Sequence, residues 1–304
     1  MAARSLGDWA LLRIDDTDPA RNLPGGEDEL LHDLEWLGLV WDEGPARQSE
    51  RRERHLEAAA QLGERFDGVT LVREDGTPTY HLASVVDDVD FGIDLIVRGS
   101  DHRPNEELHR RLFVALGAEP PEFVHHGLIL GEDGKKLSKR APGATVGQLR
   151  EAGIPAEAVR RYLEELGVPK HDVHYDLPRI RRLAIEAIGA LSDDELAERV
   201  GAPVALVPAL RGARDLNEAG DYATAILEPA PVAVDAPETL ERFRELLERA
   251  NGGNDPKELV RELKAVGGDL RALRLALTGR ERGPELWTVL AALPREELLR
   301  RTER

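Results

Sequence analysis

The strongest chemical signal in the sequence is the basic loop Gly134–Arg140, GKKLSKR. Four cations and a hydroxyl group on a glycine-flanked loop can wrap a polyphosphate, with lysine acting as a movable point charge and arginine as a planar fork. Lysine is rare in this chain, which has 6 lysines beside 35 arginines, and 3 of the 6 lie between residues 135 and 139. A solvated basic loop is the alternative, and the loop by itself leaves it open.

Polar residues beside apolar runs are the other candidates for chemistry. One apolar run ends in an acidic turn that begins at Asp15, and another ends at Arg98. Taken alone, Arg98 is typical of an arginine at the end of a strand, and Tyr80 of an aromatic residue at the edge of a core. The pair Asp87-Asp88 could bind a metal ion or cap a turn, and we favour the cap.

Strands and helices alternate in the first half of the chain. Apolar runs predict strands at 10–14, 69–73, 93–98 and 123–130, and helices are predicted at 27–37, 49–65 and 105–116. This alternation is typical of a doubly wound parallel sheet. The basic loop follows the last of these strands, and ligands of such sheets bind at the carboxyl ends of the strands.

The second half is predicted to be entirely helical. Helices are expected at 145–152, 155–166, 178–190, 192–200, 203–215, 237–250, 255–266, 268–278 and 283–302. The Pro-rich piece 228–231 is a linker or a loop between two of them. The fold class is therefore an α/β half followed by an all-α half.

The amino-acid composition excludes several classes of protein and of functional site. A net charge of −17 argues against a protein that coats nucleic acid nonspecifically, although residues 271–304 carry eight arginines and five glutamates. Disulfides, cysteine zinc sites and thiol nucleophiles are excluded because the chain has no cysteine. It contains no apolar stretch of membrane-spanning length and no signal-peptide pattern. We expect a cytoplasmic protein with no membrane partner.

Several ordered segments resemble those of one family. KLSKR is similar to the KMSKS signature of class I aminoacyl-tRNA synthetases in its glutamyl form. LLRIDDTDPARN, WLGLVWDEGPARQSER, DGTPTYHLASVVDD, VRGSDHRPNEELHRRLFVALG and FVHHGLILGEDG resemble, in this order, segments of glutamyl- and glutaminyl-tRNA synthetases. ALRLALTGRERGPEL and PREELLRR resemble the end of the family's anticodon-binding region.

The resemblance implies a Rossmann-type catalytic domain at 1–141, a helical stem-contacting region at 142–191 and an α-helical anticodon-binding domain at 192–304. It also implies a reaction in which L-glutamate and ATP, accompanied by Mg²⁺, form glutamyl adenylate, which then esterifies tRNA(Glu). No metal ion held by the protein itself is expected, and a monomer is expected.

Site residues follow from the same resemblance. Asp15 would hold the α-ammonium of glutamate, where the family usually has Glu; Tyr80 and Ser84 would line the pocket, and Arg98 would pair with the γ-carboxylate. Lys139 would neutralise the triphosphate with help from Lys136 and Ser138, and Arg140 would also bind ATP. Asp101 and His102 are candidates for contacts to adenosine or to substrate. Arg274, Arg280 and Arg282 would contact tRNA.

Two departures from the family pattern keep other functions open. The family's first strand and its HIGH signature would precede Met1, so that Ala2–Leu6 resembles the end of the following helix. Between Arg51 and Asp67 a short helix replaces a sizeable insertion that holds the tRNA acceptor end. The alternatives are a catalytically impaired tRNA-binding paralogue and a relative that glutamylates queuosine in tRNA. The absence of cysteine and the ALRLALTGRERGPEL segment argue against the queuosine relative.

Overall fold

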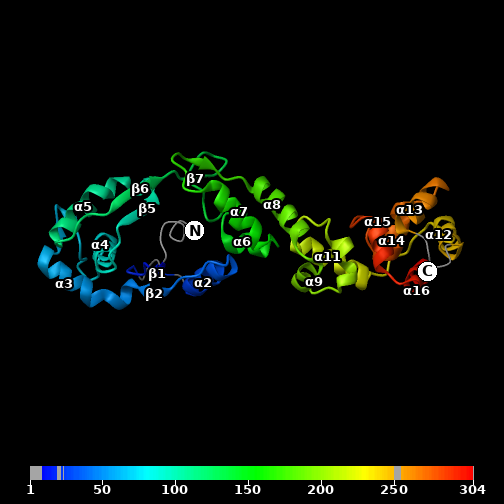
Figure 1. Cartoon of the computed structure of the whole chain (residues 1–304), viewed down its shortest axis with the longest axis horizontal. Helices are drawn as coiled ribbons and strands as arrows, with labels where there is room; N and C mark the ends of the chain where they lie inside the picture. The colour runs from blue at the N-terminus through cyan, green and yellow to red at the C-terminus, as the bar shows by residue number, and fades with distance from the viewer. Residues whose placement is uncertain (1–8, 19–21, 23, 250–254, 304) are drawn as a thin grey trace. The chain divides into compact units, whose positions relative to one another are not determined.

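The computed structural model describes residues 9–18, 22, 24–249 and 255–303. The chain forms two compact units, one of residues 1–147 and 163–176 and the other of residues 148–162 and 177–304. Among the described residues every strand lies before Tyr175, and helices occur along the whole length (Figure 1). The predicted segment Ala2–Leu6 lies outside the described residues. The predicted division at 141/142 and 191/192 stays a prediction.

Strands in the first unit pair mainly in parallel. The pairs are β1 (Leu11–Ile14) with β2 (Glu43–Arg47), β5 (Leu95–Gly99) with β6 (Glu122–His126), and β7 (Ile129–Leu130) with β8 (Val173–His174). Among the strands of the described residues, β3 (Arg65–Phe66) and β4 (Val69–Thr70) are the one pair that runs antiparallel, as a hairpin. The predicted α/β half with parallel strands is confirmed. Strand β2, with the sequence EGPAR, was not predicted, because its sequence has neither an apolar run nor alternation.

Helices accompany these strands, and three of the four share one core. They are α2 (Gly26–Trp36), α3 (Arg52–Leu62) after the 3₁₀ turn η1 (Gln48–Arg51), α4 (Tyr80–Asp90), and α5 (Glu106–Ala115) after η2 (Ser100–Asn105). Leu82, Val85 and Val86 on α4 are buried against Leu112 and Phe113 of α5. The helix α4 was not predicted, although these apolar residues recur at helical spacing.

The remainder of the described chain is helical apart from β8, which confirms the predicted all-α half. Its helices are α6 (Val146–Glu151), α7 (Ala156–Leu166), α8 (Leu177–Ala190), α9 (Asp193–Val200), η3 (Val204–Leu206), α10 (Val207–Leu210), α11 (Leu216–Leu227), α12 (Pro237–Arg249), α13 (Pro256–Ala265), α14 (Leu270–Thr278), α15 (Leu286–Ala292) and α16 (Arg295–Thr302). One apolar core of the second unit runs from Ile188 to Leu298 and includes the fully buried Phe243. None of the helices within the described ranges is long and apolar enough to span a membrane.

Two helix predictions in this half were wrong. The single helix expected at 283–302 is two helices, because Pro294 lies at the cap position of α16 and cannot donate a backbone hydrogen bond inside a helix. The helix expected at 203–215 ends at Leu210, and α11 follows it with Asp215 as its cap. Here Ala219, Ala223 and Ile226 are buried, so tertiary packing compensates for the weak helix formers Gly and Thr in its sequence.

Candidate active site

A cavity of about 760 Å³ lies in the first unit and brings together Asp15, Tyr80, Ser84 and Arg98. Asp15 directly follows β1, and Arg98 lies one residue before the end of β5. Tyr80 and Ser84 share one face of α4, because residues four apart in a helix lie above each other. Three separate segments therefore contribute the four predicted glutamate-pocket residues to one cavity.

Arg98 is the cationic anchor of this cavity. Its Nε donates to Nε2 of His125 over 3.2 Å, its Nη1 lies 3.2 Å from Nδ1 of His109, and its guanidinium stacks over the ring of Phe123 at 4.7 Å. Nη2 is buried without a hydrogen-bond partner. No carboxylate of the described residues forms an ion pair with Arg98. A partly buried cation without an anion is costly, so the cavity is suited to an anionic ligand.

Tyr80 and Ser84 present neutral polar groups beside this cation. Burial raises the pKa of the Tyr80 phenol although Arg98 opposes the shift, so the hydroxyl stays a hydrogen-bond donor at neutral pH. Ser84 is 3% exposed, and its Oγ has no partner within the described part of the chain. An unpartnered buried hydroxyl is uncommon, which makes Ser84 a candidate for a ligand contact.

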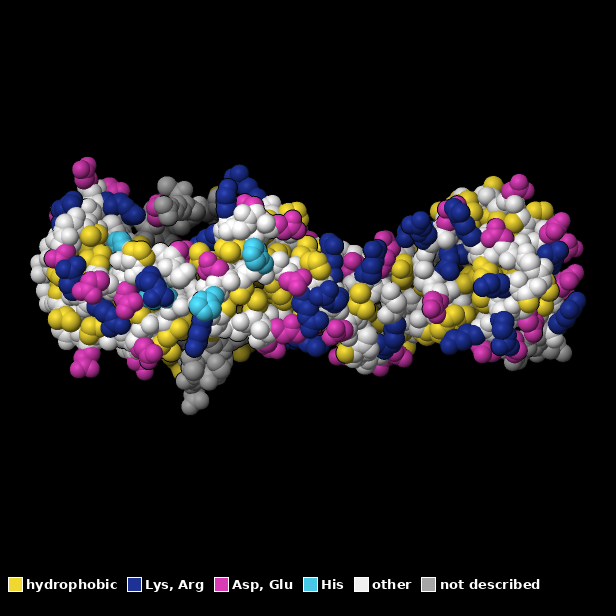
Figure 2. All heavy atoms as spheres, turned by 90° about the horizontal axis from the view of Figure 1, so that it is seen from above, with side chains coloured by type: hydrophobic (Ala, Val, Ile, Leu, Met, Phe, Trp, Pro, Cys, Tyr) yellow, Lys and Arg dark blue, Asp and Glu magenta, His cyan; other side chains and the backbone are white. Residues whose placement is uncertain are grey.

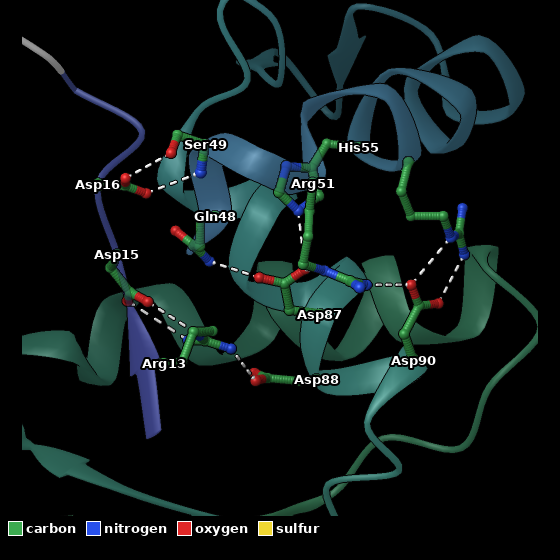
Figure 3. Close-up of polar contacts among 11 residues, drawn as sticks. Arg13, Asp15, Asp16, Gln48, Ser49, Arg51, His55, Asp87, Asp88 and Asp90 are labelled. Atoms are coloured by element: carbon green, nitrogen blue, oxygen red, sulfur yellow. Dashed lines mark hydrogen bonds and ion pairs between the residues drawn. The ribbon is translucent and has the colours of Figure 1, made fainter. Parts of the chain in front are cut away.

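Arg13 bridges two carboxylates at the same cavity. Its Nε donates to Oδ1 of Asp15 over 2.7 Å and its Nη1 to Oδ1 of Asp88 over 2.6 Å, as Figure 3 shows. Burial raises the pKa of Asp88 even though Arg13 counteracts the shift. Arg13 and Asp88 line the cavity but were not predicted as site residues. Both lie inside the segments that carry the family resemblance, which was the available signal.

The neighbouring Asp87 is the centre of a buried polar network. Its carboxylate accepts hydrogen bonds from Gln48 over 2.9 Å, Arg51 over 2.7 Å and His55 over 2.8 Å (Figure 3). Burial alone would raise the pKa of Asp87, but these donors outweigh burial and lower it. Asp87 and Asp88 lie within α4, so the predicted turn cap was wrong. The network instead fixes α4, which carries Tyr80, to η1 and α3.

The basic loop forms a tight hairpin. Leu137 donates its backbone N–H to Ile129 over 2.8 Å and Gly131 donates to Lys135 over 2.8 Å. Nζ of Lys136 reaches Oδ2 of Asp101 over 2.6 Å. A second cavity, of about 380 Å³, lies beside this hairpin, the end of β5 and the end of β6. It is lined by Gly99, Asp101, His102, His126, Leu128, Ile129, Lys136 and Leu137.

The remaining predicted ATP-binding residues lie beyond this hairpin. Ser138, Lys139 and Arg140 are exposed. Oγ of Ser138 accepts the backbone N–H of Arg140 over 3.2 Å. Within the described ranges the side chains of Lys139 and Arg140 form no ion pair. Because Arg98 lines the first cavity and Gly99 the second, the two cavities lie on either side of the end of β5.

The predicted tRNA-contacting arginines differ in their surroundings. Arg274 is partly buried and donates to the carbonyl of Pro284, and burial lowers its pKa. Arg280 lies 3.8 Å from Asp221, whereas Arg282 is exposed and pairs with none of the described carboxylates. On the face in Figure 2, basic and acidic side chains are interspersed across the C-terminal helices. Arg282 and Arg280 are therefore better placed than Arg274 to meet a ligand.

Comparisons with known proteins agree over almost the whole chain. The family model "tRNA synthetases class I (E and Q), catalytic domain" matches residues 1–65 and 59–175. Glutamate–tRNA ligase 1 of Rubrobacter xylanophilus is 32% identical and the match covers 99% of this chain and 91% of the relative. Glutamate–tRNA ligase of Akkermansia muciniphila is 31% identical, with 98% and 92% covered.

A solved structure supports the fold. A crystal structure of a glutamate tRNA ligase from Elizabethkingia meningosepticum, in complex with its amino acid, superposes with a TM-score of 0.76 at 21% identity. The match covers 96% of this chain and 91% of that chain. The predicted Rossmann-type half followed by a helical half is thereby confirmed.

The alignments also indicate that the chain lacks internal segments of its relatives. The alignment with the Rubrobacter relative runs over 392 residues, although the chain has 304. The two blocks matched by the family model meet at residues 59–65, between Arg51 and Asp67. There the structure has only α3 and the start of the β3–β4 hairpin. That the acceptor-binding insertion is the segment absent at this position stays a prediction.

Proposed function

Because the chain belongs to the class I tRNA synthetases of the glutamate and glutamine type, we propose that it joins L-glutamate to tRNA(Glu) through glutamyl adenylate. The observation that carries the choice of amino acid is Arg98, which lines the cavity without a carboxylate partner. A γ-carboxylate supplies the missing anion, whereas the amide of glutamine does not. The relatives named as glutamate–tRNA ligases support the same choice.

The other cavity residues complete the amino-acid site. Asp15 offers carboxylate oxygens to the α-ammonium, and Arg13 holds that carboxylate in place. Tyr80 and Ser84 supply neutral hydroxyl groups in the same cavity. A carboxylate and a guanidinium in one cavity complement the α-ammonium and the γ-carboxylate of glutamate and orient it.

For adenylate formation, we assign the binding of ATP to the second cavity and the basic hairpin. An oxygen of the α-carboxylate attacks the α-phosphorus, the bond from that phosphorus to the bridging oxygen breaks, and pyrophosphate leaves. Lys139 and Lys136 stabilise the negative charge that builds up on the phosphate oxygens, and Ser138 and Arg140 help to bind the triphosphate. A hydroxyl of the terminal tRNA ribose then attacks the glutamyl carbonyl and AMP leaves.

Mg²⁺ would accompany ATP on its phosphate oxygens and neutralise part of their charge. No group of three or more His, Cys, Asp or Glu side chains among the residues described could hold a metal ion.

We assign the binding of tRNA to the helical half, with Arg280 and Arg282 as contacts. The paralogue without activity and the queuosine-modifying relative are not favoured, because the matched glutamate–tRNA ligases align with the helical half as well as the catalytic half. A cytoplasmic monomer belongs to the same proposal, and light scattering on the purified protein tests the oligomeric state.

The deciding experiment measures amino-acid-dependent ATP–pyrophosphate exchange and the charging of tRNA(Glu) by the purified chain. We expect exchange with glutamate and charging of tRNA(Glu), with glutamine at least about 10²-fold less efficient. Binding of tRNA(Glu) with neither exchange nor charging would support the impaired paralogue, and glutamylation of queuosine-containing tRNA would support the queuosine relative. Exchange that is equal with both amino acids would contradict the role of Arg98.

A further inference from the structure

The acceptors around Arg98 are neutral imidazole nitrogens. The Nε–H of Arg98 points at Nε2 of His125, and its Nη1 at Nδ1 of His109. A guanidinium has only donors, so each of these two ring nitrogens must carry a lone pair. The direction of both hydrogen bonds follows from this one constraint.

The same constraint also determines which nitrogens of His109 and His81 carry a proton. When Nδ1 of His109 accepts from Arg98, the neutral ring carries its proton on Nε2. That Nε2 lies 3.1 Å from Nδ1 of His81 and donates to it. His109 is 1% exposed, and burial followed by the charge of Arg98 lowers its pKa to about 3. We call the hydrogen-bonded series Arg98–His109–His81 the relay. At neutral pH its arginine is charged and its two histidines are neutral.

On the other side, His125 continues to a carboxylate. Its Nδ1 lies 3.5 Å from Oε2 of Glu106, whose Oε1 accepts from Nε of Arg110. The carboxylate is thus separated from Arg98 by an imidazole ring and is itself paired with another arginine. Burial and then Arg98 lower the pKa of His125 in spite of Glu106.

We propose that His109 is a specificity-determining positioning residue for glutamate. It satisfies a donor of Arg98 without neutralising the cation, and it holds the guanidinium so that Nη2 remains for the γ-carboxylate of the substrate. An aspartate or glutamate at this position would hold the guanidinium equally well but would cancel its charge. Because the inference names the determinant of amino-acid choice, it rests on the proposed function.

The test compares three variants at one position. His109→Gln keeps a neutral acceptor and a donor, His109→Leu removes both, and His109→Glu replaces the neutral acceptor with an anion. We measure kcat and KM for glutamate and for glutamine in ATP–pyrophosphate exchange, and thermal unfolding of each variant. The Leu variant should raise the glutamate KM about 10-fold with a kcat near that of wild type, and the Gln variant should restore the KM.

The Glu variant is the most discriminating. We expect its preference for glutamate over glutamine to fall by about 10²-fold, because an internal ion pair removes the uncompensated charge. A folded Glu variant with the preference of wild type would overturn the inference, and so would a Gln variant no better than Leu. Failure of the proposed function has a different signature, in which the wild-type protein itself shows no exchange with glutamate.

Imidazole ¹⁵N NMR of the wild-type protein at pH 7 tests the relay without any activity or substitution. His109 protonated on Nε2 with a bare Nδ1 supports it. A ring protonated on Nδ1, or on both nitrogens, contradicts it. If the Glu variant does not fold, the comparison of the Gln and Leu variants decides the question.

Discussion

Lys136 and Asp101 form an ion pair of 2.6 Å between Nζ and Oδ2, across 35 residues of sequence. The pair connects the basic hairpin to η2, the turn that directly follows β5, and Arg98 lies near the end of β5. Lys136 lowers the pKa of Asp101 through this contact. Of the two lysines assigned to the triphosphate, Lys136 thus already has an anion in the described structure, whereas Lys139 has none.

For this reason Lys139 is the cleaner residue to replace. Lys139→Ala should slow glutamate-dependent pyrophosphate exchange by about 10² to 10³, which is the usual effect of losing one donor to a transition-state oxyanion. The unfolding temperature should not change, because the lysine is exposed. Lys170→Ala, an exposed lysine of the same unit, is the control. Equal loss in both variants, or none in either, would remove Lys139 from the reaction.

Replacing Arg98 should affect the amino acid rather than ATP. Arg98→Ala is expected to raise the glutamate KM at least about 10²-fold and to reduce discrimination against glutamine, since the γ-carboxylate loses its charged partner. The KM for ATP should stay within a few-fold of wild type. Arg111→Ala, on the exposed side of α5, serves as the matched control. An ATP KM that rises as steeply as that for glutamate would point to a structural role.

Charge reversal in the helical half tests the tRNA contacts. Arg280→Glu combined with Arg282→Glu should weaken binding of tRNA(Glu), and the slope of log affinity against log salt should become shallower by about 1 per lost phosphate contact. Arg274 is left unchanged because its hydrogen bond to Pro284 stabilises the fold. Arg249→Glu combined with Arg261→Glu, two exposed changes of the same total charge, controls for net charge. The proposal fails if both variants weaken binding equally.

The Asp87 network predicts a pH dependence of stability. Asp87→Ala should lower the free energy of unfolding by about 3 kcal/mol at neutral pH, because it leaves buried donors without their acceptor. The folded-state pKa of Asp87 is lowered, so its contribution is complete above the unfolded-state pKa and disappears as pH falls through the folded-state value. Denaturant unfolding at pH 7 and at pH values below 3.8, the ordinary pKa of an aspartate, measures both. A difference between variant and wild type that grows toward acid would contradict the sign.

Local sequence patterns were sufficient to predict part of the fold and part of the candidate site. The basic loop stood out by its composition, the apolar runs located β1 and β5, and the ordered segments indicated the class I synthetase family. Each of these features is a property of a few consecutive residues, so no knowledge of long-range contacts was required. The four residues predicted for glutamate binding meet in one cavity because the parallel strands and α4 present their ends to it.

The tertiary structure decided what surrounds these residues. Arg13 meets Asp88 across 75 residues, and Arg98 meets His125 across 27, contacts that no local pattern encodes. A histidine in sequence is equally suited to a core, a surface or a site, and only burial against Arg98 makes His109 a neutral acceptor. The charge state of the site thus depends on which groups exclude water from one another, and that is a property of packing.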